Sequence, residues 1–143
     1  MWTAEAVLVC ALTLLGRSER SFPPIQFVDT VPAGASAGTE ALVGVKHPHI
    51  YVLTSSPLFQ RLQRAADRCG ELTALRKLAS VLVHEERHVV QHASETDAYA
   101  AQLTALTALG SGPGTPLFTE VSTAMRHTLA KRRPEPVRMM VTR

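Results

Sequence analysis

The 143-residue sequence is poor in the features that mark several classes of protein. Aromatic residues make up only 5% of it, there are two cysteines, and no apolar run approaches the roughly 20 residues that span a bilayer. We therefore expect no membrane-spanning segment and a core that needs no disulfide staples. Cys10 and Cys69 have no metal-type spacing and lie in apolar or helical surroundings. We expect them to be buried free thiols.

The charge of the chain gives no sign of a nucleic-acid partner. The net charge of +3 is small, and much of the excess lies near the C-terminus. No aromatic residues interleave with these positive charges, so the stretch lacks the base-stacking groups of a nucleic-acid-binding arm. We expect a single domain at residues 1–130, followed by a basic, flexible tail at residues 131–143.

Residues 4–15 form an apolar run that resembles the core of a signal peptide. However, Glu5 stands where a positive region would precede it, and residues 16–20 contain no small-residue cleavage site. The run is also too short to cross a bilayer. We expect an N-terminal helix that packs on the core of a cytoplasmic protein with no membrane partner. Export, with the run kept as an uncleaved or remnant signal, is the alternative.

Apolar spacing and turn residues divide the rest of the domain into strands and helices. Strands are predicted at residues 25–29, 41–46 and 50–54, with a hairpin turn between the last two. Helices are predicted from Ser56 and Pro57 to a stop at Gly70, and at residues 71–91, 95–109 and 115–130. These elements predict an α+β fold, with a small sheet of about three strands packed on helices.

The segment His84-Glu85-Glu86-Arg87-His88 has the pattern H-E-x-x-H and lies inside the predicted helix 71–91. Histidines four residues apart are offset by about 40° around a helix and about 6 Å along it, so both imidazoles can face one ion. Imidazole is a good zinc ligand. Glu85, close to the same face, is placed to hold an attacking water instead of the metal. Apolar residues around the motif indicate a partly buried helix, in which a metal would satisfy both imidazoles.

A catalytic zinc site needs a third protein ligand. Ser94, with Asp97 three residues later, resembles a capping box and predicts a new helix that starts at Glu95 and runs antiparallel to the first. Glu95 would then lie near His88. Asp97 is the alternative, either as a ligand or as a group that holds a ligating imidazole. His92 is a weaker candidate, because ligands at i, i+4 and i+8 on a straight helix diverge too far.

The motif followed by Glu95-Thr-Asp-Ala-Tyr99 resembles the zincin metallopeptidases, and among them the gluzincins, in which a glutamate on the next helix completes the zinc site. The resemblance covers about residues 71–103. It implies a minimal zincin fold, with an active-site helix followed by an antiparallel helix. It also implies a Zn²⁺ peptidase with His84, His88 and Glu95 as metal ligands and Glu85 as general base. The interval from His88 to Glu95 is shorter than in the large gluzincins.

Two further parts of a peptidase site have candidates. Tyr99, one turn after Glu95, is placed to stabilise the oxyanion that forms during hydrolysis, or else packs in the core and hydrogen-bonds a ligand. The resemblance to zincins also implies that an extended peptide binds along an edge strand of the sheet. Residues 50–54 are our candidate for that strand, and a purely structural role is the alternative.

The leading hypothesis is therefore a zinc-dependent metallopeptidase that hydrolyses peptide or protein substrates. The alternative is a non-catalytic, metal-stabilised peptide-binding or regulatory domain. A third possibility is a helical interaction protein, because solvated helix faces made of Glu, Arg and His also produce such strings by chance. The sequence makes no prediction of the oligomeric state.

Overall fold

The computed structural model describes residues 1–32, 35, 38–44 and 48–132. The elements in chain order are α1 (Ala4–Leu14), the 3-10 turn η1 (Glu19–Ser21), β1 (Ile25–Val28), β2 (Ala41–Val43), β3 (Ile50–Leu53), α2 (Pro57–Gln63), α3 (Leu72–Gln91), α4 (Glu95–Ala108) and α5 (Pro116–Arg132). The three strands form one mixed sheet that packs on the helices. The predicted α+β class is confirmed.

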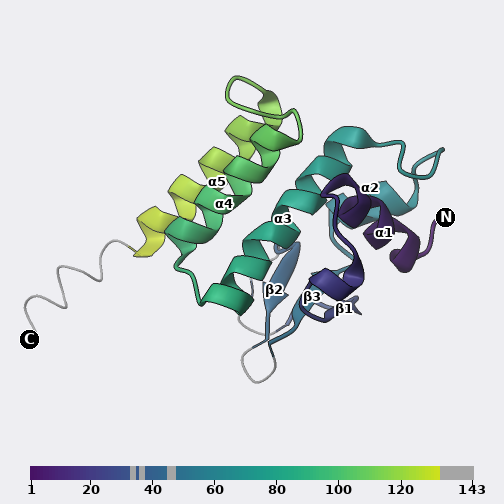
Figure 1. Ribbon diagram of the computed structural model, residues 1–143, viewed down its shortest axis with the longest axis horizontal. Helices are drawn as coiled ribbons and strands as arrows, with labels where there is room; N and C mark the ends of the chain where they lie inside the picture. Colours follow the sequence, from purple (N-terminus) through teal and green to yellow (C-terminus); the bar gives the residue numbers. More distant parts are fainter. Residues whose placement is uncertain (33–34, 36–37, 45–47, 133–143) are drawn as a thin grey trace, which may run out of the picture.

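Helix α3 lies at the centre of the molecule, between the other helices (Figure 1). Figure 1 shows it running diagonally, with α1 and α2 on one side and the α4–α5 hairpin on the other. Its N-terminal half contributes Leu75, Leu78 and Leu82 to the main core, each at most 3% exposed. These side chains pack with α1, α2 and the central strand because leucines at i, i+3 and i+7 share one helix face.

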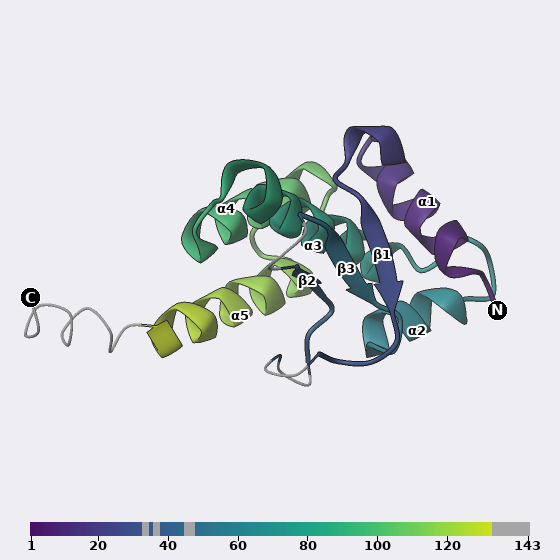
Figure 2. The ribbon, with the colours of Figure 1, turned by 90° about the horizontal axis from the view of Figure 1, so that it is seen from below.

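Strand β3 lies in the middle of the sheet, between β1 and β2 (Figure 2). It pairs parallel with β1 and antiparallel with β2, so Val52 stands opposite both Phe27 and Ala41. Ile50, Val52 and Leu53 are at most 1% exposed. The prediction that residues 50–54 form the substrate-binding edge strand is therefore wrong, because this nearly continuous apolar run belongs at the buried centre. The edge strand nearest α3 is β2.

The predicted N-terminal helix is confirmed as α1. Four of its residues are at most 4% exposed, namely Val7, Leu8, Ala11 and Leu12. None of the helices in the described part of the chain is both long enough and apolar enough to cross a membrane. At the other end of the chain α5 runs to Arg132, past the predicted boundary at residue 130. Residues 133–143, most of the predicted tail, lie outside the described residues.

Helix α2 begins as predicted, with Ser56 accepting a hydrogen bond from the Phe59 amide and Pro57 in the first turn. It ends at Gln63, however, and not near Gly70. The reason is that Leu62 is its last buried apolar residue, so nothing after it anchors a further turn to the core.

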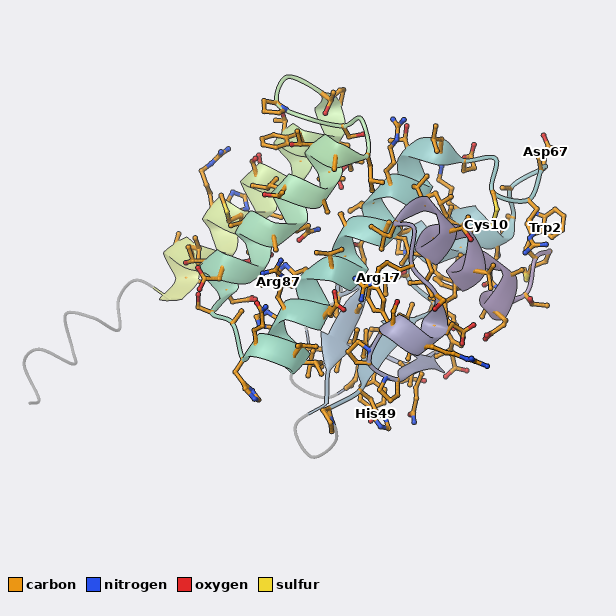
Figure 3. All side chains as sticks on the ribbon, viewed as in Figure 1. Trp2, Cys10, Arg17, His49, Asp67 and Arg87 are labelled. Carbon is orange, nitrogen blue, oxygen red and sulfur yellow. A yellow bond between two sulfur atoms is a disulfide. The ribbon has the colours of Figure 1, made fainter. Side chains whose placement is uncertain are left out.

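Cys10 and Cys69 form a disulfide, with their Cα atoms 5.6 Å apart, so the prediction of free thiols is wrong (Figure 3). The N-terminus of α1 lies against the end of α2. The Trp2 indole N–H donates to the Ala65 carbonyl at 2.9 Å, and the Gln63 side chain donates to the Trp2 carbonyl at 3.0 Å. These contacts bring together two cysteines that are 59 residues apart in sequence.

Replacing both cysteines by alanine should lower the free energy of unfolding by about 4 kcal/mol, because the bond closes a 59-residue interval in the unfolded chain. Urea unfolding of the oxidised protein and of the double variant measures the difference. Added reductant should lower the midpoint of the parent protein and leave the double variant unchanged. A parent protein whose midpoint does not respond to reductant would show that the bond contributes nothing to stability.

Candidate metal centre

The C-terminal half of α3 carries the three motif residues on one face. One potential ligand atom from each of His84, Glu85 and His88 lies within 4.8 Å of the others. The side chains of His84 and Glu85 are buried, with residue exposures of 7% and 9%. A buried ionisable cluster of this kind is costly unless it is paired or binds a metal.

The turn after α3 delivers Glu95 to this face. His92 takes a left-handed conformation, with φ of 51°, and ends α3. Ser94 then caps α4 by accepting the Asp97 amide at 3.2 Å, so α4 starts at Glu95. The predicted tight connection between the two helices is thus present. It places the first residue of α4 beside the last turns of α3.

The Glu95 carboxylate contacts both imidazoles. Its Oε1 lies 3.1 Å from His84 Nε2 and 2.5 Å from His88 Nε2. The two Nε2 atoms are 3.2 Å apart. In a tetrahedral zinc site, bonds of 2.0–2.1 Å leave ligand atoms about 3.3 Å apart. Two of the three separations fit that spacing, whereas 2.5 Å is shorter even than a charge-assisted N–H···O hydrogen bond, which is about 2.7–2.9 Å long.

A buried relay fixes the orientation of the His84 ring. The Ser80 hydroxyl donates to the Lys77 carbonyl at 2.7 Å, so its oxygen accepts from the Gln102 amide nitrogen at 3.3 Å. The carbonyl oxygen of Gln102 therefore faces His84 Nδ1 at 2.8 Å and accepts its proton. Because Nδ1 carries the hydrogen, Nε2 of the neutral imidazole is left with a lone pair directed at Glu95 and His88.

His88 is fixed in the same way. Its Nδ1 donates to the backbone carbonyl of Ala93 at 2.8 Å, in the turn before α4. Neutral His88 thus also turns a lone pair toward Glu95 Oε1. Two nitrogens and one oxygen, all acceptors, converge with no hydrogen between them unless a ring is protonated. Such a group binds either a proton or a metal cation.

The electrostatics agree with a shared positive charge. Hydrogen bonding to His84, and then the charges of His84 and His88, lower the pKa of Glu95 to about 2 against the opposing effect of burial. Burial lowers the pKa of His84, but the hydrogen bond to Glu95 and the charges of Glu85 and Glu95 outweigh it, so the pKa is raised. Burial raises the pKa of Glu85 to about 7, and the charges of His84 and His88 offset only part of that effect.

The other residues singled out in the sequence lie apart from this centre or contact it differently. Asp97 is exposed beside Arg87, because two residues along α4 turn it about 200° away from Glu95. His92 is exposed at the end of α3. The Tyr99 ring stands edge-on to His84, with centroids 4.5 Å apart, and its hydroxyl hydrogen-bonds Thr128 on α5 at 3.2 Å. Its role toward an oxyanion stays a prediction.

Glu86, the third residue of the motif, points away from the centre to the N-terminal segment. Both of its carboxylate oxygens accept from the Arg17 guanidinium, at 2.6 and 3.2 Å. The guanidinium also lies over the Phe22 ring, 4.3 Å from its centroid. This bidentate ion pair joins the turn of α3 that carries the motif to the segment that follows α1.

Sequence reasoning missed Gln102, Ser80 and the Ala93 carbonyl. A signal for the first two was present, since Gln102 lies seven residues after Glu95 on one face of α4 and Ser80 lies four residues before His84 on α3. No sequence signal marked the Ala93 carbonyl, because its contact depends on the shape of the turn.

No family model, curated protein or solved structure matches the chain.

Gln102→Met should weaken zinc binding by about 10- to 100-fold, since the apolar side chain removes the acceptor that holds His84 Nδ1–H. Competition with a chromophoric chelator measures the dissociation constant. Gln26→Met, on the exposed face of β1, is the matched control and should bind zinc like the parent. Equal zinc affinities in all three proteins would show that the hydrogen bond from His84 to Gln102 does not contribute to metal binding.

Metal-free protein should lose stability as the pH rises from 4.5 to about 8. The pKa of Glu85 is raised from 4.5 to about 7, and that of His84 is raised above 6.5. Over this window the folded chain holds more protons at Glu85 and His84 than the unfolded chain, so the stability that these two groups contribute is lost as the pH rises through their folded pKa values. Below the window Glu95, with its lowered pKa, has the opposite effect. Melting temperatures in a chelator measure this, and Glu85→Gln should flatten the dependence. A melting temperature that increases over the window would contradict the shifts.

Proposed function

We propose that this chain is a zinc-dependent metallopeptidase of the zincin type. His84, His88 and Glu95 are its metal ligands, and Glu85 is its general base. The observation that carries the proposal is the convergence of Glu95 Oε1 with the Nε2 atoms of two imidazoles, each of which is held by a hydrogen bond at its Nδ1. Two imidazoles and one carboxylate are the donor set of a catalytic zinc, which leaves a coordination position for substrate or water.

Zinc, when bound, polarises the scissile carbonyl and makes an attacking water more acidic. Glu85 takes the proton of that water and passes it to the nitrogen of the leaving amine. In the metal-free chain burial raises the pKa of this carboxyl group to about 7, so its environment favours holding a proton. Glu95 would bind the metal through its carboxylate, which already contacts both imidazoles.

The substrate lies along β2 in this proposal. One edge of β2 pairs with β3, and its other edge has no partner among the described strands. A hollow of about 660 Å³ runs beside it and is lined by residues 41–43 together with His84, Glu85 and His88. An extended peptide that adds to this edge by main-chain hydrogen bonds would present its carbonyl to the metal centre. Strand β2 thus replaces residues 50–54 as the substrate-binding strand.

The disulfide favours an oxidising compartment as the place of action. Disulfides form and persist in secreted and periplasmic proteins and are rare in the reducing cytoplasm. The Cys10–Cys69 bond joins the first helix to the core, so α1 is a stable part of the domain. The exported alternative therefore fits the chain better than the cytoplasmic one.

Glu85→Gln should keep zinc and lose hydrolysis by at least about 10²-fold, because the amide keeps the shape of the side chain but cannot accept the proton of water. Zinc content is measured by elemental analysis of untagged protein, and cleavage is measured by mass spectrometry of a peptide mixture. Glu86→Gln is the matched control, since its side chain contacts Arg17 outside the centre. Undiminished cleavage by Glu85→Gln would show that Glu85 is not the general base. Zinc binding without cleavage by the parent protein would leave the non-catalytic metal-stabilised domain.

A further inference from the structure

A cleft of about 440 Å³ extends from the candidate metal centre toward the N-terminal half of α3. Its floor is one face of α3, where Lys77 and Val81 precede the catalytic residues. Residues 38–41 form one wall, and α4 and α5 form the other. The cleft therefore joins the metal centre at one end to Lys77 at the other.

Lys77 is clamped between two carboxylates from the two walls. Its Nζ lies 2.9 Å from Glu40 Oε2, just before β2, and 2.5 Å from Glu120 Oε2 on α5. The side chains of Lys77 and Glu40 are 24% and 21% exposed, whereas that of Glu120 is 57% exposed. The group carries two negative charges and one positive charge, so this end of the cleft is acidic by one charge.

The hydrogen-bonding capacity of Lys77 and the two carboxylates also favours binding of a cation. One ammonium offers three N–H donors, while each carboxylate has about four lone-pair sites. Acceptors are therefore in excess, and an incoming cation can bind without displacing Lys77. An incoming anion would have to compete with two carboxylates for a single ammonium. Because Glu120 is the more exposed, it can turn toward a ligand at the small cost of a surface ion pair.

The size and lining of the cleft suit a long side chain with a charged end. Val81, Val121 and Ala124 line it along with the charged residues. Lys77 precedes His84 by seven residues, or about 10 Å along the helix axis. A lysine or arginine side chain spans about 6 Å from its Cα to its charge, given bonds near 1.5 Å. Such a residue beside the scissile bond would cover about 6 of those 10 Å with its stem against the apolar lining, and the exposed Glu120 side chain can turn to meet its charge.

We propose that this cleft is the specificity pocket for a lysine or arginine side chain next to the scissile bond, with Glu40 and Glu120 as the residues that recognise its positive charge. This inference rests on the proposed function, because it assigns the substrate class of the same site. It differs from strand addition along β2, which sets the path of the main chain and not the identity of a side chain.

The test separates binding from hydrolysis by using zinc-loaded Glu85→Gln protein. Short fluorescent peptides that differ only in carrying Lys, Arg, Leu or Glu at one position are compared by fluorescence anisotropy. Lys and Arg peptides should bind about tenfold more tightly than the Leu peptide, and the Glu peptide should bind least. Adding Glu120→Gln or Glu40→Gln should reduce that preference and leave the affinity for the Leu peptide unchanged. Glu71→Gln, which removes a surface ion pair with Arg61, is the control.

Three results would overturn the pocket. These are equal affinity for the Lys and Leu peptides, equal weakening of all peptides by Glu120→Gln, or tightest binding of the Glu peptide with dependence on Lys77. The parent protein is then tested for hydrolysis of the same peptides. Basic peptides that bind but are not cut support the pocket and count against the peptidase, whereas cleavage without a basic preference supports the peptidase and overturns the pocket.

Discussion

The structure depends on one local constraint, which is that three acceptor atoms from two helices are held against one another. His84 Nε2, His88 Nε2 and Glu95 Oε1 lie 2.5 to 3.2 Å apart. Neither imidazole can relieve the arrangement by exchanging its ring proton, because each Nδ1 donates to an oxygen that only accepts. A positive charge at the centre is therefore required. A proton or a metal cation meets this requirement.

Most of the fold serves to keep these atoms in place. Helix α3 is anchored by its leucines in the core and by the Arg17 pair with Glu86 at the motif itself. Helix α4 carries both Glu95 and Gln102, so one element supplies the proposed ligand and also orients the opposing ring. The same face of α3 continues to Lys77, whose backbone ends the relay and whose side chain lies at the far end of the cleft. The candidate metal centre and the charged end of the cleft thus lie on the same helix.

Local chemistry explains which parts could be predicted. The ends of α3 and α4 follow from apolar spacing and from the Ser94 cap, and these two helices with their short turn bring Glu95 to the histidines. Features that depend on distant segments could not be read in the same way. The order of the strands, which puts β3 at the centre, and the Cys10–Cys69 bond both arise from contacts between residues far apart in sequence. The relay through Gln102 lies between these cases. The sequence shows that Gln102 shares a helix face with Glu95, but it does not show that Gln102 contacts the His84 ring.

A crystal structure of protein purified with zinc, with anomalous diffraction recorded on both sides of the zinc absorption edge, is the decisive test of the proposed metal site. We expect one strong anomalous peak per chain, bonded to His84 Nε2, His88 Nε2 and a Glu95 oxygen at about 2.0–2.2 Å. We also expect Glu85 to lie near the metal without being bonded to it. An absent peak, or a peak held by other residues with the Glu95 carboxylate turned away from both imidazoles, would contradict the proposed site.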